Sequence, residues 1–88
     1  MAMVWVPSLL QKLTNGADKV SVPGATLRQV INNLDERHPG FKARLLDDEG
    51  RFLEGIAIAI DGEVTHLGLL ERVGEESEVH IIPAIGGG

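Results

Sequence analysis

The chain contains no cysteine and no tyrosine among its 88 residues. Without cysteine there is no disulfide framework, no CxxC zinc or redox motif and no thiol nucleophile. The serines Ser8, Ser21 and Ser77 lie in no GxSxG motif, so a hydrolase site would have to assemble from scattered side chains. No residue pattern therefore supports an enzyme.

Basic residues are few, with eight Lys and Arg against thirteen Asp and Glu, which gives a net charge of −5. A protein that binds a nucleic-acid backbone presents a cluster of Lys and Arg, and the chain has none. We expect no nucleic-acid partner. A basic protein surface suits this charge better.

Long apolar runs are also missing, and no stretch approaches the length of a membrane span. Residues 1–6 lack the basic residues of a signal peptide, and Pro7 follows them directly. We expect a cytoplasmic protein with no membrane partner.

Metal-ligand patterns are absent as well. His38, His66 and His80 show no ligand spacing and no HExxH, and the acidic run 47–50 lacks the spacing of a calcium loop. The final glycines are followed by no Lys-Ser/Thr, so they form no phosphate loop. We expect neither a metal nor a stably bound cofactor.

One helix is well marked over residues 26–37. Thr26 and Gln29 form a capping-box pattern, and His38-Pro39-Gly40 ends the helix. Apolar residues recur at i, i+3, i+4 and i+7, namely Leu27, Val30, Ile31 and Leu34. A further helical turn is indicated over 41–46.

The remaining segments predict strands, with turn signals at Thr14-Asn15-Gly16 and Asp61-Gly62. The expected strands are 3–6, 18–22, 56–60, 63–64 and 78–82. One helix over one mixed sheet is the compact arrangement for these elements, so the fold class is α+β. The helix stripe should pack on one sheet face: Val4, Val6, Ile56, Ile58, Ile60, Val79 and Ile81.

Strand alternation places a second set of side chains on the opposite sheet face. It contains one tryptophan and four smaller side chains: Trp5, Ala57, Ala59, His80 and Ile82. Since exposed aromatic residues are enriched among interface hot spots, this face is a predicted partner-docking surface. The alternative is that Trp5 folds over a sheet edge or under residues 67–70 and serves packing only.

The chain ends in Pro83-Ala84-Ile85-Gly86-Gly87-Gly88, directly after the last predicted strand. Glycines carry no side chain that would block attack on the terminal carboxylate, so residues 84–88 are predicted to form a flexible tail that enters another protein. Residues 1–83 are the predicted domain. Frayed terminal residues without a function are the alternative.

These features together resemble the ubiquitin-like sulfur carriers, which include the molybdopterin-synthase small subunit and the thiazole sulfur carrier. The most specific segments are Ala59-Ile60-Asp61-Gly62-Glu63, residues 74–79 and Ile82-Pro83-Ala84-Ile85-Gly86-Gly87. Val6-Pro7-Ser8-Leu9-Leu10 and the insert 39–52 look most like the carrier of thiocarboxylate-dependent cysteine biosynthesis.

The resemblance implies a ubiquitin-like β-grasp roll, with one main helix on a mixed sheet of four to five strands. It also implies that a ubiquitin-activating-type adenylyltransferase uses ATP to adenylate the terminal carboxylate, which then becomes a thiocarboxylate. The acceptor would be a cysteine synthase-like enzyme or the molybdopterin synthase large subunit.

Family members usually end in two glycines, whereas this chain has three. The reacting residue is therefore either Gly88 or, after trimming by a metallopeptidase, Gly87, with Ala84, Ile85 and Gly86 as the rest of the tail. A modifier that is conjugated to lysine through its terminal glycine, and an inert ubiquitin-fold interaction module, remain as alternatives.

Overall fold

The computed structural model describes residues 1–83 and contains one five-stranded sheet in the order β2-β1-β5-β3-β4. β1 and β5 are parallel, and all other neighbours are antiparallel. The strands are β1 (Ala2–Trp5), β2 (Lys19–Val22), β3 (Ile56–Ile60), β4 (Glu63–Val64) and β5 (Glu78–Pro83). The expected mixed sheet of four to five strands is confirmed.

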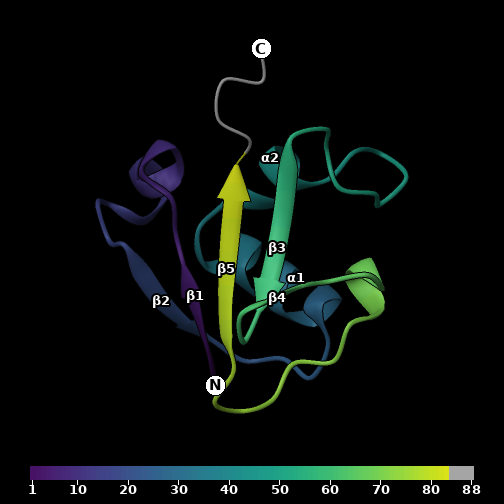
Figure 1. The fold of residues 1–88 in the computed structure, drawn as a ribbon. Coiled ribbons are helices and arrows are strands. Elements are labelled where there is room, and N and C mark those ends of the chain that lie inside the picture. Colours follow the sequence, from purple (N-terminus) through teal and green to yellow (C-terminus); the bar gives the residue numbers. More distant parts are fainter. Residues whose placement is uncertain (84–88) are drawn as a thin grey trace.

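The helices α1 and α2 lie behind the strands in Figure 1 and cover one face of the sheet. The helical segments are η1 (Ser8–Thr14), α1 (Leu27–Arg37), α2 (Phe41–Leu45) and η2 (Gly68–Leu70). The Thr26 side chain accepts a hydrogen bond from the Gln29 backbone N–H, as the capping pattern predicts. The Gln29 side chain bonds to the N–H of Ala25 instead of that of Thr26.

The core lies between α1 and the inner sheet face. Leu27, Val30, Ile31 and Leu34 are all at most 2% exposed, and the predicted partners on the sheet join the same cluster. Ile56 and Ile60 are only partly buried. The sequence pattern did not identify several other core members: Ala2, Leu10, Val22, Phe41, Leu45, Leu46 and Val73.

The predicted turn at Asp61-Gly62 joins β3 to β4, with positive φ angles of 52° and 90°. The Asp61 carboxylate accepts hydrogen bonds from the Ser77 hydroxyl and the Glu78 backbone N–H, each at 2.9 Å. This turn is thereby tied to the start of β5.

Among the described residues, no helix is long and apolar enough to cross a membrane.

Candidate functional site

β5 carries the chain toward its C-terminus, and it lies at the centre of the sheet between β1 and β3 (Figure 1). Its last two residues still pair, Ile82 with Ala57 and Pro83 with Ile56. The side chains of Val79 and Ile81, which belong to β5, are buried in the core. The base from which the terminal segment continues is therefore firmly held.

The predicted reactive residues Gly87 and Gly88, and the predicted tail residues Ala84, Ile85 and Gly86, lie outside the described residues. The tail boundary after Pro83 and the choice between Gly87 and Gly88 stay predictions.

The five residues of the predicted docking set share the outer sheet face. Strand register aligns one row across all five strands, from β2 to β4: Lys19, Trp5, His80, Ala59 and Val64. Ile82 and Ala57 pair in the adjacent row, nearer the end of β5. We call the row from Lys19 to Val64 the outer row.

An aromatic stack forms the centre of the outer row. The rings of Trp5 and His80 are parallel within 3°, with centroids 5.4 Å apart. The Lys19 ammonium lies 5.2 Å from the centroid of the Trp5 ring. His80 Nε2 lies 3.6 Å from a carboxylate oxygen of Glu78. These contacts hold the two rings in one orientation, so they form a rigid platform.

Two predicted docking residues are less accessible than expected. Trp5 was expected to be exposed, but its side chain is partly buried because it stacks on His80 and lies under Lys19. Ala59 is 7% exposed, since it is a small residue paired with His80 on one side and Val64 on the other. Ala59 therefore forms the floor of the face instead of a contact.

The sequence prediction missed Lys19 and Val64 as members of this face. Val64, on the edge strand β4, is 52% exposed, and Ile82, on the central strand β5, is 42% exposed, so both add apolar surface to the face. Alternation along 18–22 would have assigned Lys19 to one face, but only the β1–β2 register places it beside Trp5. The Trp5 indole N–H is buried and has no hydrogen-bond partner in the part of the chain that the structure describes.

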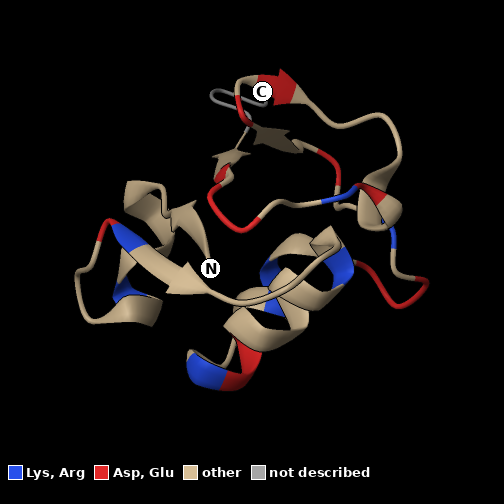
Figure 2. Cartoon of the chain, turned by 90° about the horizontal axis from the view of Figure 1, so that it is seen from below, with Lys and Arg blue, Asp and Glu red and all other residues tan. Residues whose placement is uncertain are grey.

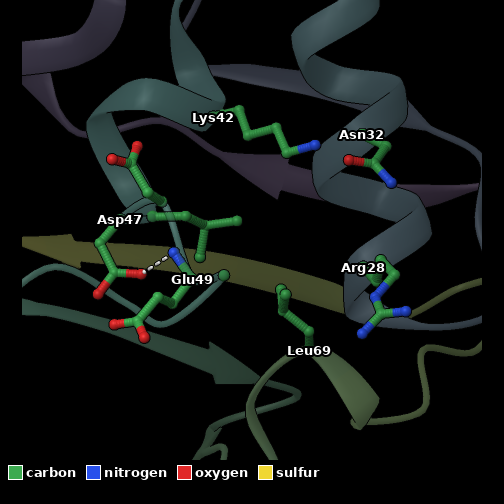
Figure 3. A pocket seen from close by; sticks show the side chains of 9 residues that line it. Arg28, Asn32, Lys42, Asp47, Glu49 and Leu69 are labelled. Atoms are coloured by element: carbon green, nitrogen blue, oxygen red, sulfur yellow. Dashed lines mark hydrogen bonds between the residues drawn. The ribbon is translucent and has the colours of Figure 1, made fainter.

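A second feature is a pocket of about 330 Å³ on the helix side, between α1, α2, the 47–50 loop and η2 (Figure 3). Arg28 and Lys42 line one part of it, and Asp47 and Glu49 another. The Asp47 carboxylate accepts backbone N–H groups of Arg51 and Glu49, which lower the pKa of Asp47. Asp47 thus orders its own loop, and these charged side chains are solvent-exposed.

Within residues 1–83, no group of three or more His, Asp or Glu side chains is placed to hold a metal ion. His38, His66 and His80 lie after α1, after β4 and within β5. The outer face therefore stands out for its aromatic and apolar surface, and not for a constellation of reactive groups.

The model of the ThiS family matches residues 4–88. The chain belongs to the ThiS family. Among curated relatives, the sulfur carrier protein CysO of Mycobacterium tuberculosis (strain ATCC 25618 / H37Rv) is 32% identical over 89 residues, which cover 97% of this chain and 96% of that protein. This ThiS-family chain is thus similar to a sulfur carrier over its whole domain.

Solved structures agree with that assignment. CysO in the Amycolatopsis orientalis BexX/CysO complex is 31% identical with a TM-score of 0.92, and the match covers 100% of both chains. Mycobacterium tuberculosis CysO is 29% identical with a TM-score of 0.91, covering 97% of this chain and 100% of that one. The fold is the ubiquitin-like β-grasp.

Small archaeal modifier protein 1 from Methanosarcina acetivorans has a TM-score of 0.83 at 21% identity, with 99% of this chain and 95% of that chain covered. At this identity the likeness shows the fold alone. It does not favour conjugation over sulfur transfer for the ThiS-family member described here.

Proposed function

We propose that this protein is a sulfur carrier whose C-terminal glycine carboxylate is converted to a thiocarboxylate. The observation that carries the proposal is the ThiS-family match, which runs through to Gly88 and includes the glycine terminus. The similarity to CysO sulfur carriers over 97% of the chain supports it. The protein acts as a co-substrate of other enzymes and binds no cofactor stably.

The chemistry follows from the poor reactivity of a free carboxylate, whose oxygen is a bad leaving group. A ubiquitin-activating-type adenylyltransferase transfers AMP from ATP to the carboxylate and releases pyrophosphate. Sulfide then displaces AMP and leaves the thiocarboxylate. A persulfide would displace AMP to give an acyl disulfide, from which a thiol reductant must release the thiocarboxylate. A terminus without side chains allows close alignment with ATP, and alignment of reacting groups lowers the barrier.

The folded domain supplies position and recognition. β5 anchors the chain up to Pro83, and the outer face beside it presents an apolar and aromatic surface. In this proposal the activating enzyme docks on Trp5, His80 and Ile82, while Ala57 and Ala59 form the floor between them.

The proposed sulfur acceptor is a cysteine synthase-like enzyme, because the curated relatives are CysO proteins. The molybdopterin synthase large subunit is the other acceptor that the resemblance implies. If Gly87 is the reacting residue, a metallopeptidase must first remove Gly88 by hydrolysing the peptide bond between them.

Mass spectrometry of the intact protein purified from its native host tests the proposal. A thiocarboxylate is heavier than the carboxylate by the difference between a sulfur and an oxygen atom, and the C-terminal fragment locates it on Gly87 or Gly88. A terminus found only as an isopeptide on lysine would make the protein a modifier. A terminus that stays a carboxylate even with the activating enzyme, ATP and sulfide would refute the proposal.

A further inference from the structure

The charge of the outer sheet face differs from that of the whole molecule. Register and alternation place ten strand residues on this face: Met3, Trp5, Lys19, Ser21, Ala57, Ala59, Val64, Glu78, His80 and Ile82. Of the thirteen acidic residues in the chain, only Glu78 is among them. Figure 2 shows red, acidic segments at several loops around the sheet and helices.

The face carries one lysine and one glutamate. The Glu78 carboxylate lies 3.6 Å from His80 Nε2, and its side chain is 58% exposed. Lys19 has no carboxylate within ion-pairing distance in residues 1–83, and its ammonium group lies over the Trp5 ring instead. Lys19 is therefore an unpaired charge at the β2 edge of the predicted interface, beside the Trp5–His80 stack.

The direction of the tail decides which charge a partner covers. β5 runs from Glu78 to Pro83, so an enzyme that receives the terminus must lie at the Pro83 end. The Lys19–Trp5–His80 row is nearer that end than the row of Ser21, Met3 and Glu78. A partner that docks from this end reaches the row of Lys19 before the row of Glu78.

Covering an unpaired ammonium group is costly, because it loses water and gains nothing in return. A partner avoids this cost only if it brings a negative charge to the same place. The exposed apolar side chains of the face lie away from Lys19. Val64 is four strand spacings of about 4.8 Å from it, roughly 19 Å, whereas Ile82 on β5 is two spacings, roughly 10 Å, across the sheet and one row nearer Pro83.

We propose that the partner surface for this face pairs a carboxylate with Lys19 and places aliphatic side chains over Ile82 and Val64. The partner is the activating enzyme of the proposed function, on which this inference rests. It reverses the expectation from net charge, because a molecule of charge −5 alone would favour a basic partner surface here.

The sign of a charge-reversal effect tests the proposal. Lys19→Glu should weaken binding to the activating enzyme roughly ten- to hundredfold, since it would set two carboxylates against each other. Lys19→Met should weaken binding less, and Lys19→Arg should bind within about twofold of the original protein because the charge is kept. Affinity is measured by calorimetry with the purified activating enzyme.

Lys42→Glu is the matched control, because it changes the net charge by the same amount on α2, away from the sheet face. It should leave the affinity nearly unchanged. The loss for Lys19→Glu should shrink as the ionic strength approaches about 1 M, where the Debye length falls to about 3 Å. Thermal melts check that each variant is folded.

The outcomes separate the two claims. If the original protein supports ATP–pyrophosphate exchange and Lys19→Glu binds equally well or more tightly, the carboxylate partner is wrong and the carrier function stands. If neither the original protein nor the chain without Gly88 supports exchange with the activating enzyme, the proposed function fails and this partner fails with it.

Discussion

At the residue scale, Trp5 has two roles. Its backbone belongs to β1, and its ring forms part of the outer sheet face. It stacks on His80 with ring centroids 5.4 Å apart and lies under the Lys19 ammonium group, so the protein itself already covers part of the ring. A large aromatic side chain held in one orientation binds a partner with little loss of conformational entropy.

Trp5→Ala should therefore weaken binding to the activating enzyme by about 1–4 kcal/mol, with a smaller loss of folding stability. Calorimetry gives the first value, and urea unfolding gives the second. Leu70→Ala serves as a control, since Leu70 is 68% exposed on η2 and lies outside the strands. Unchanged binding together with a loss of several kcal/mol in folding would mean that Trp5 serves packing only.

Asp61 makes stability depend on pH. The N–H of Glu78 and then the Ser77 hydroxyl bond to its carboxylate and lower its pKa. A carboxylate with a lowered pKa in the folded state stabilises the fold above its unfolded pKa of about 3.9, and this stabilisation is lost as the pH falls through the folded-state value.

Asp61→Asn should be less stable than the original protein at neutral pH, and the difference should shrink below about pH 4. Asparagine keeps an oxygen acceptor and tolerates the positive φ of 52°, so the change isolates the charge. Urea unfolding at several pH values measures it. A difference that stays constant into acid would show that the ionised carboxylate contributes nothing.

At the scale of elements, α1 provides the largest single part of the core. Leu34 is 1% exposed, and Leu34→Ala should cost about 2–5 kcal/mol because it leaves a cavity against the sheet. Glu36→Ala, on the exposed side of the same helix, should change stability by no more than about 0.5 kcal/mol. Equal effects of the two substitutions in urea unfolding would contradict the assigned core.

The connection from β2 to α1 depends on Gly24. Its φ is +152°, and an added Cβ would lie 2.8 Å from both the Val30 backbone nitrogen and a Val30 side-chain carbon. At Gly16, where φ is +91°, an added Cβ would meet nothing within 4 Å. Gly24→Ala should thus destabilise the fold more than Gly16→Ala, by thermal melting. The reverse order would mean that backbone conformation, and not this contact, dominates.

The elements that sequence predicted well are those whose signals are local. The helix stripe, the Thr26 cap and the Asp61-Gly62 turn each depend on residues within a few positions of one another, and the structure confirms them. η1 was missed because it has no helical stripe. Its ends are held by side chains that bond to the backbone, Gln11 to Val6 and Thr14 to Ala17.

The candidate site was predicted in part, for the same reason. Alternation placed Trp5, Ala57, His80 and Ile82 on one face, because alternation is a local property. The contact of Lys19 with Trp5, the stack on His80 and the tie between Asp61 and Ser77 join residues on separate strands and loops. Only the register of the folded sheet brings these pairs together.

At the scale of the whole molecule, the fold and the proposed chemistry are separate in the chain. Among residues 1–83, every member of the core lies between Ala2 and Ile81, whereas the proposed reactive carboxylate lies beyond Pro83. Changes at the terminus should therefore alter activation without altering folding. Gly87→Val tests this, because a branched side chain would obstruct a channel sized for glycine. It should block activation and leave the melting temperature unchanged.

ATP–pyrophosphate exchange by the activating enzyme tests the central claim most directly. Either the full chain or the chain without Gly88 should support exchange, and the chain without Gly87 and Gly88 should support none, while all three melt at nearly the same temperature. Removing Gly88 alone identifies the reacting residue, since exchange survives only if Gly87 is the acceptor of AMP. Exchange that persists with the truncated chain would show that the terminal glycine carboxylate is not the site of activation.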